Sequence, residues 1–135
     1  MTYENSETLI RFGWGQDAME RLVPGSAAAV LIDVLSFTTC VDVAVSRGAI
    51  IYPYRWRDLS AVEFAGSKGA ILASRRGEGG YSLSVQSLLA IPAGTNLVLP
   101  SPNGATLSLL SGEVPLLAGS LRNATAVALA AQQLG

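Results

Sequence analysis

Short apolar runs alternate with stretches of helical periodicity along almost the whole chain. The runs that have the length of strands are residues 8–12, 28–32, 49–52, 70–73, 96–99 and 114–118. The stretches that predict helices are residues 17–22, 38–46, 58–65, 84–89, 105–110 and 121–134. Strands that alternate with helices are typical of a mostly parallel sheet crossed by helices. We therefore predict an α/β fold with a mostly parallel sheet that forms one domain over residues 1–135.

Three of these elements carry more specific signals. Residues 28–32 are apolar on both faces, which predicts a strand buried on both sides. Pro53 is expected to end the strand at 49–52, because proline cannot donate to a ladder. Gly48 stands where the C-terminal cap of the preceding helix belongs.

The predicted helix at 121–134 is apolar over most of its circumference. Between Asn96 and Gly135 the only charged residues are Glu113 and Arg122. A helix of this kind is normally buried on more than one side. We expect either a homo-oligomer whose partner subunit covers it, or a C-terminal segment beyond Gly135 that does so. The alternative is an Ala-rich surface helix that tolerates exposure.

Composition excludes several classes of function. Half of the 135 residues are hydrophobic, 14% are charged and the net charge is −1, so no basic field predicts nucleic acid or an anionic membrane as a partner. The chain has no His, which excludes Ser-His-Asp triads and His-ligated zinc within it. The single cysteine, Cys40, predicts a reducing compartment, and we expect it to be a small buried hydrophobe. With no apparent signal peptide or membrane-spanning run, we expect a cytoplasmic protein.

Polar residues follow the predicted strands at several points. In an open parallel sheet, ligands bind beyond the carboxyl ends of the strands, where these residues would meet. The candidates for this edge are Asp33, Thr38, Thr39, Arg75, Arg76, Glu78, Asn103, Gly104, Ser120 and Asn123.

Asp33 is the strongest of these candidates. It ends an apolar run, where a carboxylate is costly unless it is paired, hydrogen-bonded or bound to a metal. One or two carboxylates with substrate oxygens and water commonly hold Mg²⁺. The alternative is that the Asp33 carboxylate hydrogen-bonds the backbone at the start of the next helix.

The remaining candidates also have simpler interpretations. Arg75 and Arg76 precede a glycine-rich loop and could bind an anion, or could form a solvated basic pair. Asn103 and Gly104 are a common turn dipeptide. The segment 120–123 could present N–H groups to an anion, or simply cap the last helix.

Three segments of the chain resemble the 2-phosphosulfolactate phosphatase family. Residues 30–39, VLIDVLSFTT, are similar to the family's V-I-D-V-L-R-A-T-T signature. Residues 101–106, SPNGAT, are similar to T-T-N-G-T-R, and residues 119–128, GSLRNATAVA, to G-S-x-x-N-A-x-A-V-A. The three motifs occur in the family's order, and the chain resembles the N-terminal part of the family's fold.

The resemblance implies an α/β/α fold and an Mg²⁺-dependent phosphatase that releases phosphate from a small phosphorylated acid. The family's substrate is 2-phospho-3-sulfolactate, on the route to coenzyme M. It implies that Asp33 is a metal ligand or acid–base carboxylate and that Asn103 lies beside the phosphate, where we predict it to be catalytic. Glu78 is our candidate for a second metal ligand, in place of the family's lost Glu, if the loop that carries it is shifted. It also places Thr38, Thr39 and Ser120 around the phosphate. Our further candidates for substrate binding are Arg75, Arg76, Gly104 and Asn123.

The chain also departs from the family's pattern. Ser36 replaces an Arg, Arg75 replaces the Glu of a G-E-R segment, and Ser82 and Val85 replace the Asp and Asn of G-F-D-L-G-N-S. Family members are longer as well. Two further hypotheses follow: a non-catalytic anion-binding or scaffold domain, and an incomplete part of a larger enzyme.

Overall fold

The computed structural model describes residues 10–135. Helices and parallel strands alternate, which confirms the α/β prediction. The strands are β1 (Ala29–Ile32), β2 (Ile50–Tyr54), β3 (Ile71–Leu72), β4 (Asn96–Pro100) and β5 (Leu116–Gly119). The helices are α1 (Gly15–Leu22), α2 (Phe37–Ser46), α3 (Leu59–Ser67), α4 (Val85–Leu88), α5 (Gly104–Ser108) and α6 (Ala124–Leu134).

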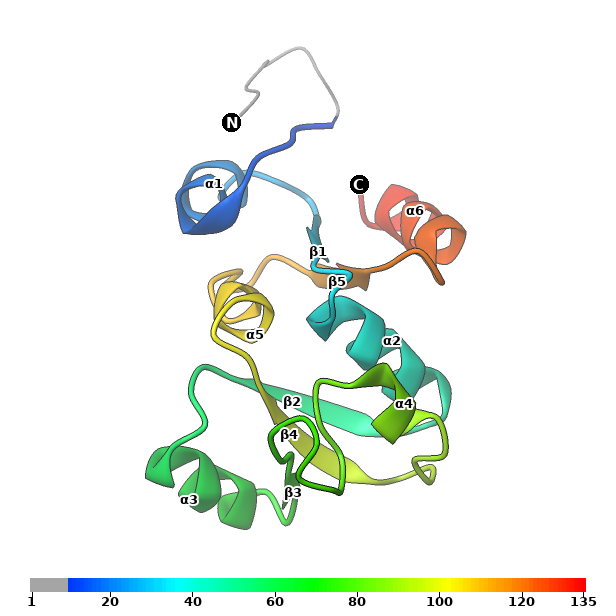
Figure 1. Ribbon diagram of the computed structural model, residues 1–135. Helices are drawn as coiled ribbons and strands as arrows, with labels where there is room; N and C mark the ends of the chain where they lie inside the picture. The colour runs from blue at the N-terminus through cyan, green and yellow to red at the C-terminus, as the bar shows by residue number, and fades with distance from the viewer. Residues whose placement is uncertain (1–9) are drawn as a thin grey trace.

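The strands form two parallel sheets rather than one. β1 pairs with β5, and β2, β4 and β3 form a second sheet in that order. Helices α2 and α5 contact strands of both sheets, and Figure 1 shows them between the β1–β5 pair and the second sheet. α3 packs on β3 and β4, and α6 lies against β5 and β1. The layers therefore differ from those of one continuous sheet covered on both faces.

The core lies around β4 and α2. β4 is the central strand of its sheet, and Leu97, Val98 and Leu99 have no exposed surface. Cys40 is also fully buried, as expected for a small hydrophobe. The same cluster includes Leu31 of β1. Residues of both sheets thus share one hydrophobic core.

Three local predictions need correction. Pro53 does not end β2 but lies within it, opposite Leu99. β2 is an edge strand, so a residue without an N–H is tolerated there. Ile10, Arg11 and Phe12 are not a strand, although Phe12 forms an isolated bridge, and Thr8 and Leu9 of that prediction lie outside the described residues.

The prediction that β1 is buried on both faces is also wrong. Leu31 faces the core, but Val30 is 40% exposed and Ile32 is 65% exposed. The alternation arises because the core cluster lies on the inner face of β1 only, where Leu31 points, and α6 leaves the outer face of β1 partly open. Gly48, by contrast, has φ of 92° directly after the α2 cap residue, as the capping prediction requires.

Helix α6 is not buried within the chain. None of its residues is buried, and Leu129 and Leu134 are 56% and 44% exposed. Leu121, just before the helix, is 88% exposed. The apolar surface that the sequence predicts for α6 is therefore not covered by other described residues of the chain. Among those residues, no helix has the length and apolarity that crossing a membrane requires.

Candidate functional site

An open cleft of about 290 Å³ lies where β1 and β4 end. Its walls come from the turn after β1, the turn after β4 and the loop between β3 and α4. The lining residues are Asp33, Leu35, Ser36, Phe37, Arg76, Leu83, Ser101, Pro102 and Asn103. The cleft thus brings together three of the predicted site residues, Asp33, Arg76 and Asn103, from three separate parts of the chain.

The turn that carries Asp33 is held by two threonines at the start of α2. The Asp33 backbone N–H donates to Thr38 Oγ1 at 2.9 Å, and the Thr38 N–H donates to the Asp33 carbonyl at 3.0 Å. Thr39 Oγ1 donates to the Val34 carbonyl at 2.7 Å. Neither threonine lines the cleft, and Thr38 is completely buried. The hydroxyls predicted to surround a substrate instead hold the backbone of this turn.

The Asp33 carboxylate makes no hydrogen bond or ion pair with any residue in the range 10–135. The residue is half-buried and its side chain faces the cleft. Ser36, not Asp33, occupies the N-cap position of α2, and its side chain makes no capping bond. The alternative in which the carboxylate binds the helix backbone is therefore not what the structure shows. A half-buried carboxylate without a protein partner is suited to bind a cation.

Gly104 allows α5 to approach Asp33. A Cβ at position 104 would lie 2.6 Å from Asp33 Oδ2 and 2.5 Å from Phe37 Cδ2. No side chain fits at that distance, so Gly104 has a steric role beyond a turn preference. Gly104 is buried, whereas the neighbouring Asn103 is exposed, lines the cleft and makes no side-chain cap bond to α5.

Arg76 reaches the cleft from the loop after β3. Its Nη2 donates to Ser36 Oγ at 2.7 Å, and its Nε donates to the Leu83 carbonyl at 3.3 Å. The Ser36 hydroxyl donates in turn to the same carbonyl. These bonds fix the guanidinium at the wall of the cleft while leaving other N–H groups available to a ligand. No acidic residue among those described lies within ion-pair distance of Arg76.

Arg75 and Glu78 lie on the same loop but do not line the cleft. Both are exposed, and their only mutual hydrogen bond joins the Glu78 N–H to the Arg75 carbonyl at 3.2 Å. No cluster of three or more metal-ligating side chains occurs within the part of the chain that the structure describes. Glu78 therefore does not share the lining of the cleft with Asp33.

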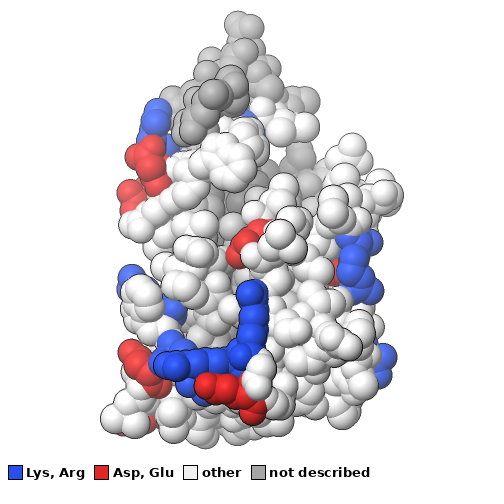
Figure 2. Space-filling view, viewed as in Figure 1, with Lys and Arg blue, Asp and Glu red and all other residues white. Residues whose placement is uncertain are grey.

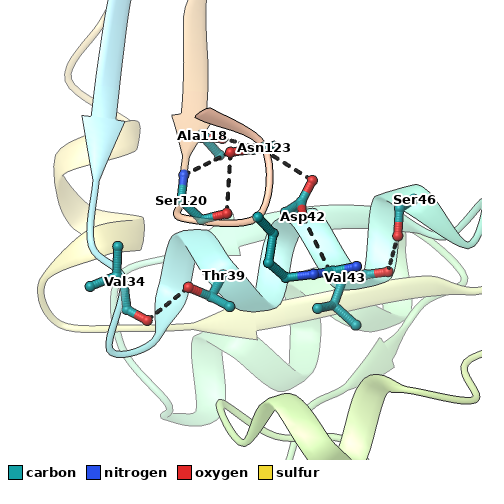
Figure 3. A network of polar contacts seen from close by, with 9 residues as sticks. Val34, Thr39, Asp42, Val43, Ser46, Ala118, Ser120 and Asn123 are labelled. Atoms are coloured by element: carbon teal, nitrogen blue, oxygen red, sulfur yellow. Dashed lines mark hydrogen bonds and ion pairs between the residues drawn. The ribbon is translucent and has the colours of Figure 1, made fainter. Parts of the chain in front are cut away.

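Ser120 and Asn123 form a separate polar network at the turn between β5 and α6 (Figure 3). Asn123 Oδ1 accepts from the Ser120 N–H at 2.8 Å and from Ser120 Oγ at 3.1 Å. Asn123 Nδ2 donates to Asp42 of α2 at 3.1 Å and to the Ala118 carbonyl at 3.0 Å. Arg122 forms an ion pair with Asp42 at 3.2 Å. The polar groups of this turn bind one another and attach it to α2.

Charges of both signs lie close together around the cleft. Figure 2 shows basic side chains in the lower part of the visible face, with acidic side chains on either side and no extended field of one sign.

Burial raises the pKa of the Cys40 thiol; a hydrogen bond with Ser36 and the Arg76 charge lower it, and the Asp33 charge raises it. Cys40 is therefore expected to remain a protonated thiol at neutral pH.

Sequence reasoning missed two contributors. Leu83 matters through its carbonyl, which no side-chain pattern reports. Asp42 is the only charged residue in α2, and an acid in a helix with no other charge was a signal that could have been read.

Comparisons with protein-family models, with curated proteins and with solved structures found no match to the chain. The resemblance to the phosphosulfolactate phosphatases is therefore a hypothesis that rests on the three motifs.

Proposed function

We propose that the protein is an Mg²⁺-dependent phosphatase that binds a small phosphorylated acid, such as 2-phospho-3-sulfolactate, in the cleft and hydrolyses its phosphate ester. One observation carries the proposal: Asp33 and Arg76 line the same cleft, and neither is paired with an opposite charge among residues 10–135. Such a site offers a ligand for a cation beside a ligand for an anion.

The donor chemistry fits Mg²⁺ in a particular way. Among residues 10–135 Asp33 supplies the one carboxylate that lines the cleft, so Mg²⁺ would complete its coordination with water and with oxygens of the phosphate ester. When bound, Mg²⁺ offsets negative charge on the phosphoryl group and lowers the pKa of bound water. Because Glu78 does not line the cleft, we leave it out of the proposed metal site.

The other cleft residues position the ester. Arg76 binds anionic oxygens with the N–H groups that Ser36 and Leu83 leave free. The Asn103 amide, which makes no bond to the protein at its cap position, orients the ester beside Asp33. Phe37 and Leu83 form an apolar wall that limits water around the charged groups.

A non-catalytic anion-binding domain is the second candidate. The observation that favours it is the absence of a second metal-ligating carboxylate at the cleft, within the described part of the chain. In that case Arg76 would still bind anions, but no ester would be cleaved.

Phosphate release from a panel of small phosphorylated acids, measured with and without Mg²⁺, separates these candidates. We expect Mg²⁺-dependent release that Arg76→Gln reduces about tenfold or more, since a charge-assisted bond to the ester is lost. Arg75→Gln is the matched comparison, because Arg75 lies outside the cleft and should retain the parental rate. Absence of release from every ester, together with phosphate binding, would favour the anion-binding domain.

We also propose that a second copy of the chain, or a further segment of the protein, covers α6. The support is its exposed apolar surface, which includes Leu121, Leu129 and Leu134. Sedimentation of the parental protein and of Leu129→Glu tests the homo-oligomer: we expect an oligomer that the charge at position 129 dissociates. A monomeric parental protein would contradict it.

We further propose a cytoplasmic location, which accords with the single buried thiol.

A further inference from the structure

The charged groups of the cleft face it without neutralising each other. Asp33 and Arg76 line one cavity of about 290 Å³, yet no ion pair within 4.0 Å joins them. Oppositely charged side chains that share a small cavity normally approach one another unless other contacts hold them apart. Here such contacts exist on both sides.

Arg76 is restrained by Ser36 Oγ at 2.7 Å and the Leu83 carbonyl at 3.3 Å. Asp33 is restrained through its backbone, which exchanges two hydrogen bonds with Thr38. The Asp33 carboxylate also lies against Gly104, where no Cβ would fit. The protein therefore holds the two charges apart, and the space between them is open to a ligand.

From this arrangement, which rests on the proposed function, we infer that phosphate and Mg²⁺ bind to the cleft as interdependent ligands, each weakly alone and more tightly together. Phosphate alone meets Arg76 but is repelled by the Asp33 carboxylate. Among residues 10–135 Asp33 is the one carboxylate that lines the cleft, so Mg²⁺ alone meets fewer protein ligands than a tight site requires. Together they leave the cleft close to neutral, since the charges of Mg²⁺ and Arg76 offset those of Asp33 and the phosphate.

The inference has a reciprocal form that can be measured. If Mg²⁺ increases the affinity for phosphate by some factor, phosphate must increase the affinity for Mg²⁺ by the same factor. Calorimetric titration of inorganic phosphate into the protein, at zero and at saturating Mg²⁺, measures the first factor. Titration of Mg²⁺ with and without saturating phosphate measures the second. We expect at least about a tenfold increase in each, which corresponds to about 1.4 kcal/mol.

Two variants should change this coupling in different ways. Asp33→Asn removes both the metal ligand and the repulsion. Its affinity for phosphate should equal or exceed that of the parental protein without Mg²⁺, and adding Mg²⁺ should no longer change this affinity. Arg76→Gln should weaken phosphate binding with and without Mg²⁺. Lys68→Gln removes one positive charge at the C-cap of α3, outside the cleft, and controls for net charge. Circular dichroism checks each fold, and Asp33→Ala replaces the Asn variant if that one unfolds.

The outcomes separate this inference from the proposed function. Equal phosphate affinity with and without Mg²⁺, or no binding of phosphate in either case, overturns the inference. A parental degree of coupling in folded Asp33→Asn also overturns it. Coupled binding without release of phosphate from any ester would keep the inference and reject the hydrolase. Ester hydrolysis by a protein that binds Mg²⁺ and phosphate independently would keep the hydrolase and reject the inference.

Discussion

Two turns at the carboxyl ends of β1 and β5 carry similar polar residues but use them differently. The strands pair in parallel, with Ile32 opposite Gly119, so Asp33 and Ser120 follow at the same edge. In the first turn the Asp33 carboxylate has no partner among residues 10–135. In the second turn Ser120 binds Asn123, and Asn123 and Arg122 both bind Asp42 of α2. Polar groups that the protein leaves unsatisfied are available to a ligand, whereas satisfied groups stabilise the fold.

The first way to test this comparison is to remove the Asp33 carboxylate, which has no partner among residues 10–135, from the turn after β1 (the open turn). Asp33→Asn should reduce Mg²⁺-dependent phosphate release by about a hundredfold or more, because the metal loses its protein ligand. The free energy of unfolding should change little, since no internal bond to the carboxylate is lost. Asp17→Asn in α1 is the control for loss of an acid. A parental rate in the Asp33 variant would make Asp33 a structural residue.

The second test disturbs the close approach of α5 to Asp33 and Phe37. Gly104→Ala should lower the free energy of unfolding by about 3 kcal/mol, because its Cβ would lie 2.5 Å from Phe37 and 2.6 Å from Asp33. Gly66→Ala in α3 meets no atom within 4 Å and should stabilise the protein by about 0.5–1 kcal/mol. Urea denaturation measures both. Equal stability of the two variants would contradict the close approach of α5 to Asp33.

The third test breaks the polar network of the turn after β5, whose polar groups bind one another (the closed turn). Asp42→Ala should cost about 1–2 kcal/mol, because the Asp42 side chain is 18% exposed and binds both Arg122 and Asn123. Asp17→Ala, which removes an exposed pair with Arg21, should cost less than about 0.5 kcal/mol. Phosphate binding by folded Asp42→Ala should remain parental. A loss of binding as large as that in Arg76→Gln would show that the two turns are not independent.

The smallest effect is expected outside both turns, at the start of α3. Asp58 caps this helix, and its hydrogen bond with Ser60 lowers the pKa of the carboxyl below its ordinary value of 3.8. A lowered pKa contributes stability above the ordinary value, and that stability is lost as the pH falls through the lower pKa. Asp58→Asn should therefore reduce the acid dependence of unfolding below about pH 4. Urea midpoints from pH 7 to pH 2 measure it, and an unchanged dependence would contradict the cap.

The sequence could predict the open turn better than the closed one. Asp33 was identified by a local signal, an acid at the end of an apolar run. Asn103 was identified by another, an Asn-Gly pair that follows a second apolar run. The partner of Arg76 is 40 positions away, and Asp42 is 81 positions from Asn123. No local pattern contains such distances. Arg75 and Arg76 have the same chemistry in sequence, and only the path of the loop separates the residue at the cleft from the solvated one.

By itself, the sequence determined the alternation of helices and strands, because hydrophobic periodicity reflects the local geometry of each element. It also determined which chemistry the chain lacks, since no His is present and only one Cys. Tertiary structure alone decided that the strands form two sheets, that the outer face of β1 stays open, and which polar groups find partners. The physical reason is that satisfaction of a polar group depends on atoms brought close by packing, and these are distant in the chain.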